Sequence, residues 1–86
     1  MDERLRRRRL AQIASGKVLF VWTRRGWLVA GPATLLAAAV QPPRPIVTVT
    51  KRRGRTTEVR VMRVIGTFSR SGVDYSTAVF TRIRRP

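Results

Sequence analysis

Turns that contain glycine or proline divide residues 17–86 into five short runs rich in valine, isoleucine, threonine and aromatic side chains. Such residues favour strands, and several short strands separated by turns are typical of small barrels. The sequence therefore predicts a mainly β fold with a short N-terminal helix (α+β), built as a small SH3-like or OB-like half-barrel of about five strands. We expect residues 1–16 to form a basic helix or arm. Residues 17–86 should form a single small β-rich domain with a proline-rich connector at 41–45.

The first sixteen residues have the composition of a basic helix. Asp2 and Glu3 lie where acidic side chains favour a helix N-terminus, and the leucine, arginine, alanine and glutamine that follow are good helix formers. Gly16 suits the position just after a helix. The arginines of Arg6–Arg9 spread over about 400° around the helix axis, so they cannot all face one groove of a ligand.

Residues 17–40 predict a hairpin followed by a helix. Two apolar runs, Lys17–Trp22 and Trp27–Ala30, flank the polar segment Thr23–Gly26, which we expect to be a four-residue turn. Pro32 is suited to open a short helix rich in alanine and leucine over Ala33–Val40.

The second half of the chain predicts a three-stranded meander. Its expected strands are Ile46–Thr50, Thr56–Ile65 and Val73–Ile83, separated by turns at 51–55 and 69–72. The apolar positions of the middle strand change parity after Val61. This change predicts a β-bulge near Val61–Met62, which bends the strand as small barrels require.

The charge balance points to a polyanionic partner. Nineteen basic residues face four acidic ones, a formal net charge of +15, and seventeen of the nineteen are arginine. Arginine grips phosphate with a planar fork of donors and stacks on bases, whereas lysine acts as a point charge. We therefore expect a nucleic-acid-binding protein that contacts phosphates.

The residues that the chain lacks exclude several kinds of chemistry. It contains no cysteine and no histidine, and its only carboxylate side chains are Asp2, Glu3, Glu58 and Asp74. This composition excludes zinc fingers, disulfide frameworks and catalysis by cysteine or histidine. Paired-carboxylate hydrolysis and two-metal phosphoryl transfer need more acidic side chains. We expect a non-enzymatic protein with no cofactor and no metal. We expect it in the cytoplasm, with the nucleoid or a ribonucleoprotein.

Three groups of side chains are candidates for contact with nucleic acid. They are the cations of the 51–55 turn, the arginine run before Leu10, and the arginines beside two tryptophans that could stack on bases. The candidate contacts are Arg6, Arg7, Arg8, Arg9, Arg24, Arg25, Lys51, Arg52, Arg53 and Arg55, with Trp22 and Trp27 as candidate stacking residues. A continuing basic stripe would add Arg60, Arg63, Arg82 and Arg84.

Each group has an alternative interpretation. The 51–55 turn could serve solubility alone, and the N-terminal arginines could be a non-specific electrostatic arm. In a chain with six aromatic residues, the pattern favours Phe20 and Trp22 as core residues over stacking residues. A second function class is a protein–protein module that docks on an acidic surface of a host or phage complex, with Trp22 or Trp27 as its anchor.

Export and membrane insertion are further alternatives. Thr23–Leu28 is similar to a twin-arginine export motif, and the small residues Ala37–Ala39 follow it as a candidate cleavage site. The apolar stretch Trp27–Val40 has fourteen residues, fewer than the ~20 that a membrane-spanning helix needs. We therefore expect no transmembrane span, and twin-arginine export is an alternative to a cytoplasmic location.

Two segments resemble small basic β-rich proteins of actinobacteria and their phages. The pattern W-L-V-x-G-P is carried by Trp27–Pro32, and V-T-V-T-K-R-x-G-x-T-x-x-V-x-V by Val47–Val61. The resemblance implies a phage-like genomic setting and no residue roles. It favours DNA over RNA as the nucleic acid.

Overall fold

The computed structural model describes residues 7–83 and, of Arg52, the backbone alone. It is mainly β with a short N-terminal helix, which confirms the expected fold class. The elements in chain order are α1 (Arg7–Ala14), β1 (Val18–Thr23), β2 (Gly26–Pro32), α2 (Ala33–Ala39), β3 (Val47–Thr50), the 3₁₀ turn η2 (Arg52–Gly54), β4 (Thr56–Arg70) and β5 (Val73–Arg82).

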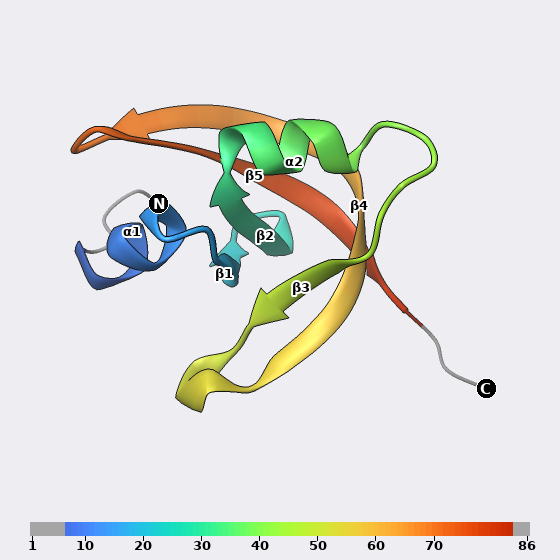
Figure 1. The fold of residues 1–86 in the computed structure, drawn as a ribbon, viewed down its shortest axis with the longest axis horizontal. Helices are drawn as coiled ribbons and strands as arrows, with labels where there is room; N and C mark the ends of the chain where they lie inside the picture. The colour runs from blue at the N-terminus through green and yellow to red at the C-terminus, as the bar shows by residue number, and fades with distance from the viewer. Residues whose placement is uncertain (1–6, 84–86) are drawn as a thin grey trace.

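The five strands form a closed barrel in the order β1-β2-β5-β4-β3 (Figure 1). Four of the strand pairs are antiparallel. The fifth pair is parallel and joins β1 to β3, with Val18 opposite Val49 and Leu19 opposite Thr50. This pair joins the two ends of the sheet, so the barrel is closed. The sequence predicted only a half-closed barrel.

Small and β-branched side chains fill the barrel interior, and α2 packs against them. The buried members of this cluster are Val18, Val29, Leu36, Ala39, Val47, Val49, Val59, Val61 and Ala78. Leu36 and Ala39 project from α2 into this cluster, and six of the seven residues of the helix are alanine or leucine. Phe20 and Phe80 pack against the same cluster and are half-buried.

A second core lies between α1 and the outer face of the sheet. Leu10 and Ile13 of α1 pack with the outward-facing residues of β1, β2 and β5, which are Leu19, Val21, Leu28, Ala30 and Tyr75. The helix ends as expected at Gly16, where the amides of Gly16 and Lys17 donate to the carbonyls of Ile13 and Gln12 in a Schellman motif. Since α1 covers one face of β1 and the barrel covers the other, the run Val18–Val21 is apolar throughout.

The long strand β4 contains the predicted bulge and a second one. Its pairing with β5 shifts register between Val61 and Arg63, as the parity change predicted, and again between Val64 and Gly66. The strand continues to Arg70, five residues beyond the predicted end, so the last turn consists of Ser71 and Gly72 alone. Bulges bend and twist a strand, and here they let one long ribbon follow the curve of the barrel.

Candidate nucleic-acid interface

The parallel pairing of β1 with β3 brings two basic turns to one end of the barrel. Because the two strands run in the same direction, both turns lie downstream of this pair, the second directly after Thr50 and the first five residues beyond Leu19. These turns are Arg24-Arg25 and Lys51–Arg55. Strand β5 also finishes at this end, where Arg82 lies opposite Val59. We call this region the basic end of the barrel.

The first basic turn is shorter than the sequence predicted. Thr23 and Gly26 are paired in the ladder, so Arg24 and Arg25 alone form the tip. The Thr23 hydroxyl donates to the Gly26 carbonyl at 2.9 Å and accepts from the Arg25 amide at 3.1 Å. Gly26 has a φ of 94°, a conformation that side chains with a Cβ rarely adopt. The turn is thus locally fixed, and both arginine side chains are exposed.

The second basic turn is a single 3₁₀ turn between β3 and β4. The Lys51 amide donates to the Arg55 carbonyl at 2.6 Å, and the Gly54 amide donates to the Lys51 carbonyl at 3.3 Å. Arg53 has a φ of 64°, unusual for a residue other than glycine. Three side chains of this turn, those of Lys51, Arg53 and Arg55, are exposed. That of Arg52 is not described.

An exposed tryptophan pair flanks the first turn. Trp22 and Trp27 lie directly opposite each other on β1 and β2, with ring centroids 5.2 Å apart and planes at 64°. Their exposed fractions are 56% and 59%. The prediction that Trp22 belongs to the core is therefore wrong, whereas Phe20, on the same face of β1, does pack against the barrel core.

Phenylalanine side chains support this pair from the barrel side. Phe20 contacts Trp27 edge to face with centroids 6.4 Å apart, and Phe80 of β5 lies 5.1 Å from Phe20. The Arg82 guanidinium carbon lies 5.8 Å from the centre of the Phe20 ring, within cation–π range. From the sequence, Arg82 was expected only in a candidate stripe and Phe80 was not a candidate. The two residues are two positions apart on β5 and therefore share a face, which the sequence already indicated.

The N-terminal arginines divide into two kinds. Arg7 and Arg8 are exposed on α1, while Arg6 lies outside the described residues. Arg9 is half-buried, and its guanidinium donates to the Phe20 carbonyl at 3.5 Å. This contact places the start of α1 beside the middle of β1. From there the helix runs toward the start of β1, away from the basic end, and Arg9 serves partly to anchor it.

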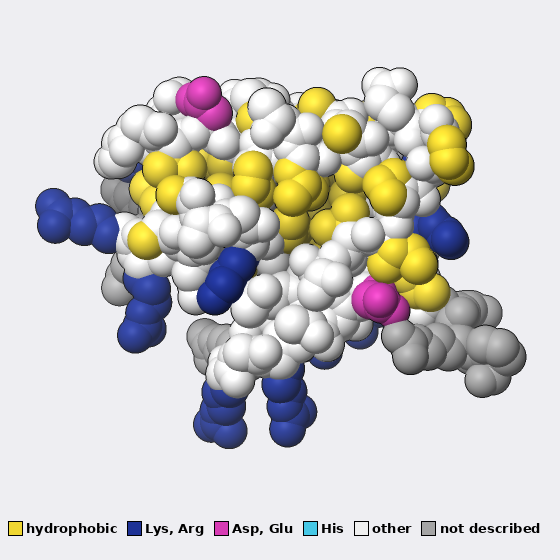
Figure 2. Space-filling model, in the orientation of Figure 1, with side chains coloured by type: hydrophobic (Ala, Val, Ile, Leu, Met, Phe, Trp, Pro, Cys, Tyr) yellow, Lys and Arg dark blue, Asp and Glu magenta, His cyan; other side chains and the backbone are white. Residues whose placement is uncertain are grey.

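The structure describes part of the candidate basic stripe. Arg60 and Arg63 are exposed on β4, and Arg84 lies outside the described residues. Figure 2 shows lysine and arginine side chains projecting from the lower and left sides of the molecule, where Figure 1 places the β3–β4 turn and α1. With nineteen basic and four acidic residues, at most four cations can be neutralised within the chain. The basic turns thus present net positive charge to solvent.

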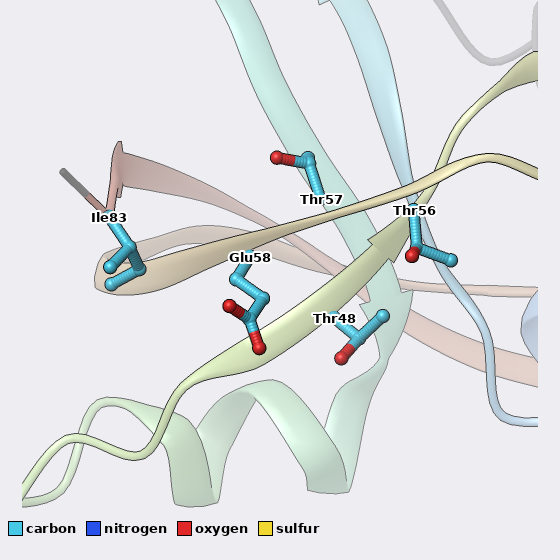
Figure 3. Close-up of a pocket in the computed structure, with 5 residues that line it drawn as sticks. All are labelled: Thr48, Thr56, Thr57, Glu58 and Ile83. Atoms are coloured by element: carbon cyan, nitrogen blue, oxygen red, sulfur yellow. The ribbon is translucent and has the colours of Figure 1, made fainter. Parts of the chain in front are cut away.

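An open hollow on the β3–β4 hairpin has different chemistry. It has a volume of about 500 Å³ and is lined by Thr48, Thr56, Thr57, Glu58 and Ile83 (Figure 3). Figure 3 shows the Glu58 carboxylate on the same side of the hairpin as the Thr48 side chain, with Thr57 turned to the other side. A carboxylate at this position repels phosphate, so we assign the hollow no phosphate contact, although it lies next to the second basic turn.

No helix within residues 7–83 is both long enough and apolar enough to cross a membrane. No protein-family model, curated protein or solved structure matches this chain. The arrangement of charged and aromatic side chains is therefore the basis for assigning a function.

Proposed function

We propose that this protein is a small non-enzymatic nucleic-acid-binding protein that contacts phosphates through the basic end of the barrel. One observation carries the proposal: the parallel β1–β3 pair directs the Arg24-Arg25 and Lys51–Arg55 turns toward the same end of a closed barrel. The resemblance to small phage-like proteins favours DNA over RNA as the ligand.

The geometry supports phosphate contact in two ways. The described cations of both turns, Arg24, Arg25, Lys51, Arg53 and Arg55, are exposed, so no buried ion pair has to break before these side chains reach a ligand. Both turns are held by local hydrogen bonds, and thus less conformational entropy is lost when the ligand binds. The exposed Arg7 and Arg8 would add contacts from the N-terminal end of α1, which lies beside the middle of β1.

Fluorescence anisotropy of the purified chain tests the proposal with three labelled ligands: duplex DNA, single-stranded DNA and hairpin RNA. If six to eight side chains neutralise phosphates of the duplex, log K should fall against log salt with a slope of about −5 to −7. A slope shallower than about −2 contradicts a mechanism dominated by phosphate contacts. Equal affinity for all three ligands and for heparin would mean that net positive charge alone accounts for binding.

The exposed tryptophan pair also supports a second candidate function. Large aromatic side chains are frequent anchors of protein interfaces, and arginines often accompany them. The basic end could therefore dock on an acidic protein surface. This candidate predicts saturable binding to one protein partner that excess competitor DNA does not displace. The nucleic-acid proposal predicts displacement.

A further inference from the structure

The tryptophan pair at the basic end is exposed to solvent. Trp22 and Trp27 are the only tryptophans of the chain, and each leaves more than half of its surface in water. Burying a side chain of this size is among the largest apolar contributions that a small domain can gain. Two such side chains, paired and exposed beside two arginines, indicate a surface adapted to a ligand.

The pair is also held in place from behind. Trp27 meets Phe20 edge to face, and Phe20 packs on Phe80 and on the barrel core. The indoles meet each other at 64°, so the rings do not cover each other's faces as a parallel stack would. Rings fixed in this way present a face to a ligand with little loss of side-chain entropy.

We propose that the Trp22–Trp27 pair is a stacking platform for unpaired bases, so that the preferred ligand of the basic end is a single strand. This inference rests on the proposed function and narrows its ligand class. Aromatic side chains beside a basic groove are the usual means of holding a single strand, because every unpaired base offers a flat face. In a duplex these faces are covered by neighbouring base pairs, and only base edges are accessible in the grooves.

The neighbouring charges fit the same ligand. Arg24 lies two residues after Trp22 and Arg25 two residues before Trp27, and both side chains are exposed, so the backbone of a strand stacked on the pair would pass near this turn. Arg82 lies over Phe20 at the inner side of the pair. The ligand would thus contact aromatic rings through its bases and arginines through its backbone, two interactions that respond differently to salt.

The intrinsic fluorescence of the full-length chain tests this proposal directly, because both fluorescent indoles belong to the platform. The probe is oligothymidylate of about 12 nucleotides, compared with a duplex and with an abasic oligomer of equal length. We expect saturable quenching of tryptophan emission by the oligothymidylate and much weaker quenching by the other two. The same oligomer made of RNA shows whether the sugar matters.

Substitutions then separate stacking from charge. Trp27→Ala and Trp22→Ala should each weaken oligothymidylate binding by about 10-fold or more at fixed salt, with an unchanged slope of log K against log salt. Both variants should bind the duplex as the parent chain does. Trp27→Phe should restore much of the affinity and leaves Trp22 as a single reporter. Thermal unfolding of each variant verifies that it is folded.

Three results would overturn the platform. The first is an abasic oligomer that binds as tightly as oligothymidylate. The second is a tryptophan variant that binds oligothymidylate with the affinity of the parent chain. The third is a tryptophan variant that loses as much affinity for the duplex as for the single strand. Each leaves phosphate binding, and hence the proposed function, intact. If no nucleic acid binds at near-physiological salt, the proposed function itself fails. An acidic protein partner whose binding quenches the tryptophans would then take its place.

Discussion

Gly31 of β2 lies against Val18 of β1 so closely that a Cβ at Gly31 would stand 2.8 Å from Cγ2 of Val18. Both residues are buried, and Val18 is also the residue that pairs with Val49 to close the barrel. The absence of a side chain at position 31 therefore makes room for the valine on which closure depends.

Gly31→Ala should destabilise the barrel because Val18 is fully packed and cannot move aside. Overpacking of this kind costs about 1–3 kcal/mol, which urea unfolding monitored by circular dichroism would measure. The double variant Gly31→Ala/Val18→Ala should lose less than the sum of the two single changes. Simple additivity would show that the two residues do not compete for the same space.

Gly26→Ala should destabilise the first hairpin through its backbone alone. Gly26 has a φ of 94°, and a Cβ at this position would meet no atom within 4 Å. The expected loss is about 1 kcal/mol in the free energy of unfolding. Gly26→Asn should cost less, since asparagine tolerates positive φ better than alanine does. Equal stability of the parent and the alanine variant would contradict the turn geometry.

Ser71→Asn should stabilise the β4–β5 hairpin slightly. Ser71 and Gly72 form a two-residue turn with φ values of 50° and 77°, the type I′ geometry in which Asn-Gly is preferred. We expect a gain of about 0.5 kcal/mol or less, measured by thermal unfolding. Ser71→Val is the matched control and should lose stability, because a β-branched residue is strained at positive φ.

The position of a charge should matter as well as its sign. Replacing Lys51, Arg53 and Arg55 with serine removes three exposed cations from the basic end. The slope of log K against log salt for single-stranded DNA should become shallower by about 2. The matched control replaces Lys17, Arg44 and Arg70, which lie outside both basic turns. Equal losses in the two triple variants would mean that net charge alone governs binding.

Arg8 and Arg9 should respond differently to the same substitution. Arg9→Ala removes the hydrogen bond to the Phe20 carbonyl, so it should lower the free energy of unfolding by about 0.5–1.5 kcal/mol. Arg8→Ala removes the same charge from an exposed position and should leave stability within about 0.5 kcal/mol of the parent. Parallel urea titrations compare them. Equal stabilities would show that Arg9 does not anchor α1.

Local residue chemistry was sufficient to predict the strands, the two helices and one β-bulge. Turn residues such as Gly26 and Gly54 mark where strands end, and the parity change after Val61 marks where β4 bends. The parallel pairing of β1 with β3 could not be predicted in this way. It depends on contacts between segments far apart in the chain, and no local pattern specifies a partner strand.

The same limit explains the error at Trp22. Alternation in a strand identifies which residues share a face, but it does not say how far along the barrel each one lies. Phe20 and Trp22 share a face of β1, yet the first is packed against the core and the second lies beyond it in solvent. The arginine content alone indicated a polyanionic partner. That the Arg24-Arg25 turn and the 51–55 turn face the same end of the barrel could be seen only from the strand pairing.

The parallel β1–β3 pairing is also the shortest strand pairing of the barrel. It holds the N-terminal hairpin to the C-terminal meander through two registered residue pairs, whereas β2 and β5 join the same halves through four. Its backbone amides should therefore exchange with deuterium sooner than those in the centre of β4 and β5. The two basic turns belong to the two halves that this pairing joins. A single-stranded nucleic acid bound to both turns would therefore hold the two halves together. Such a ligand would slow exchange at Leu19 and Thr50, even though it touches neither residue.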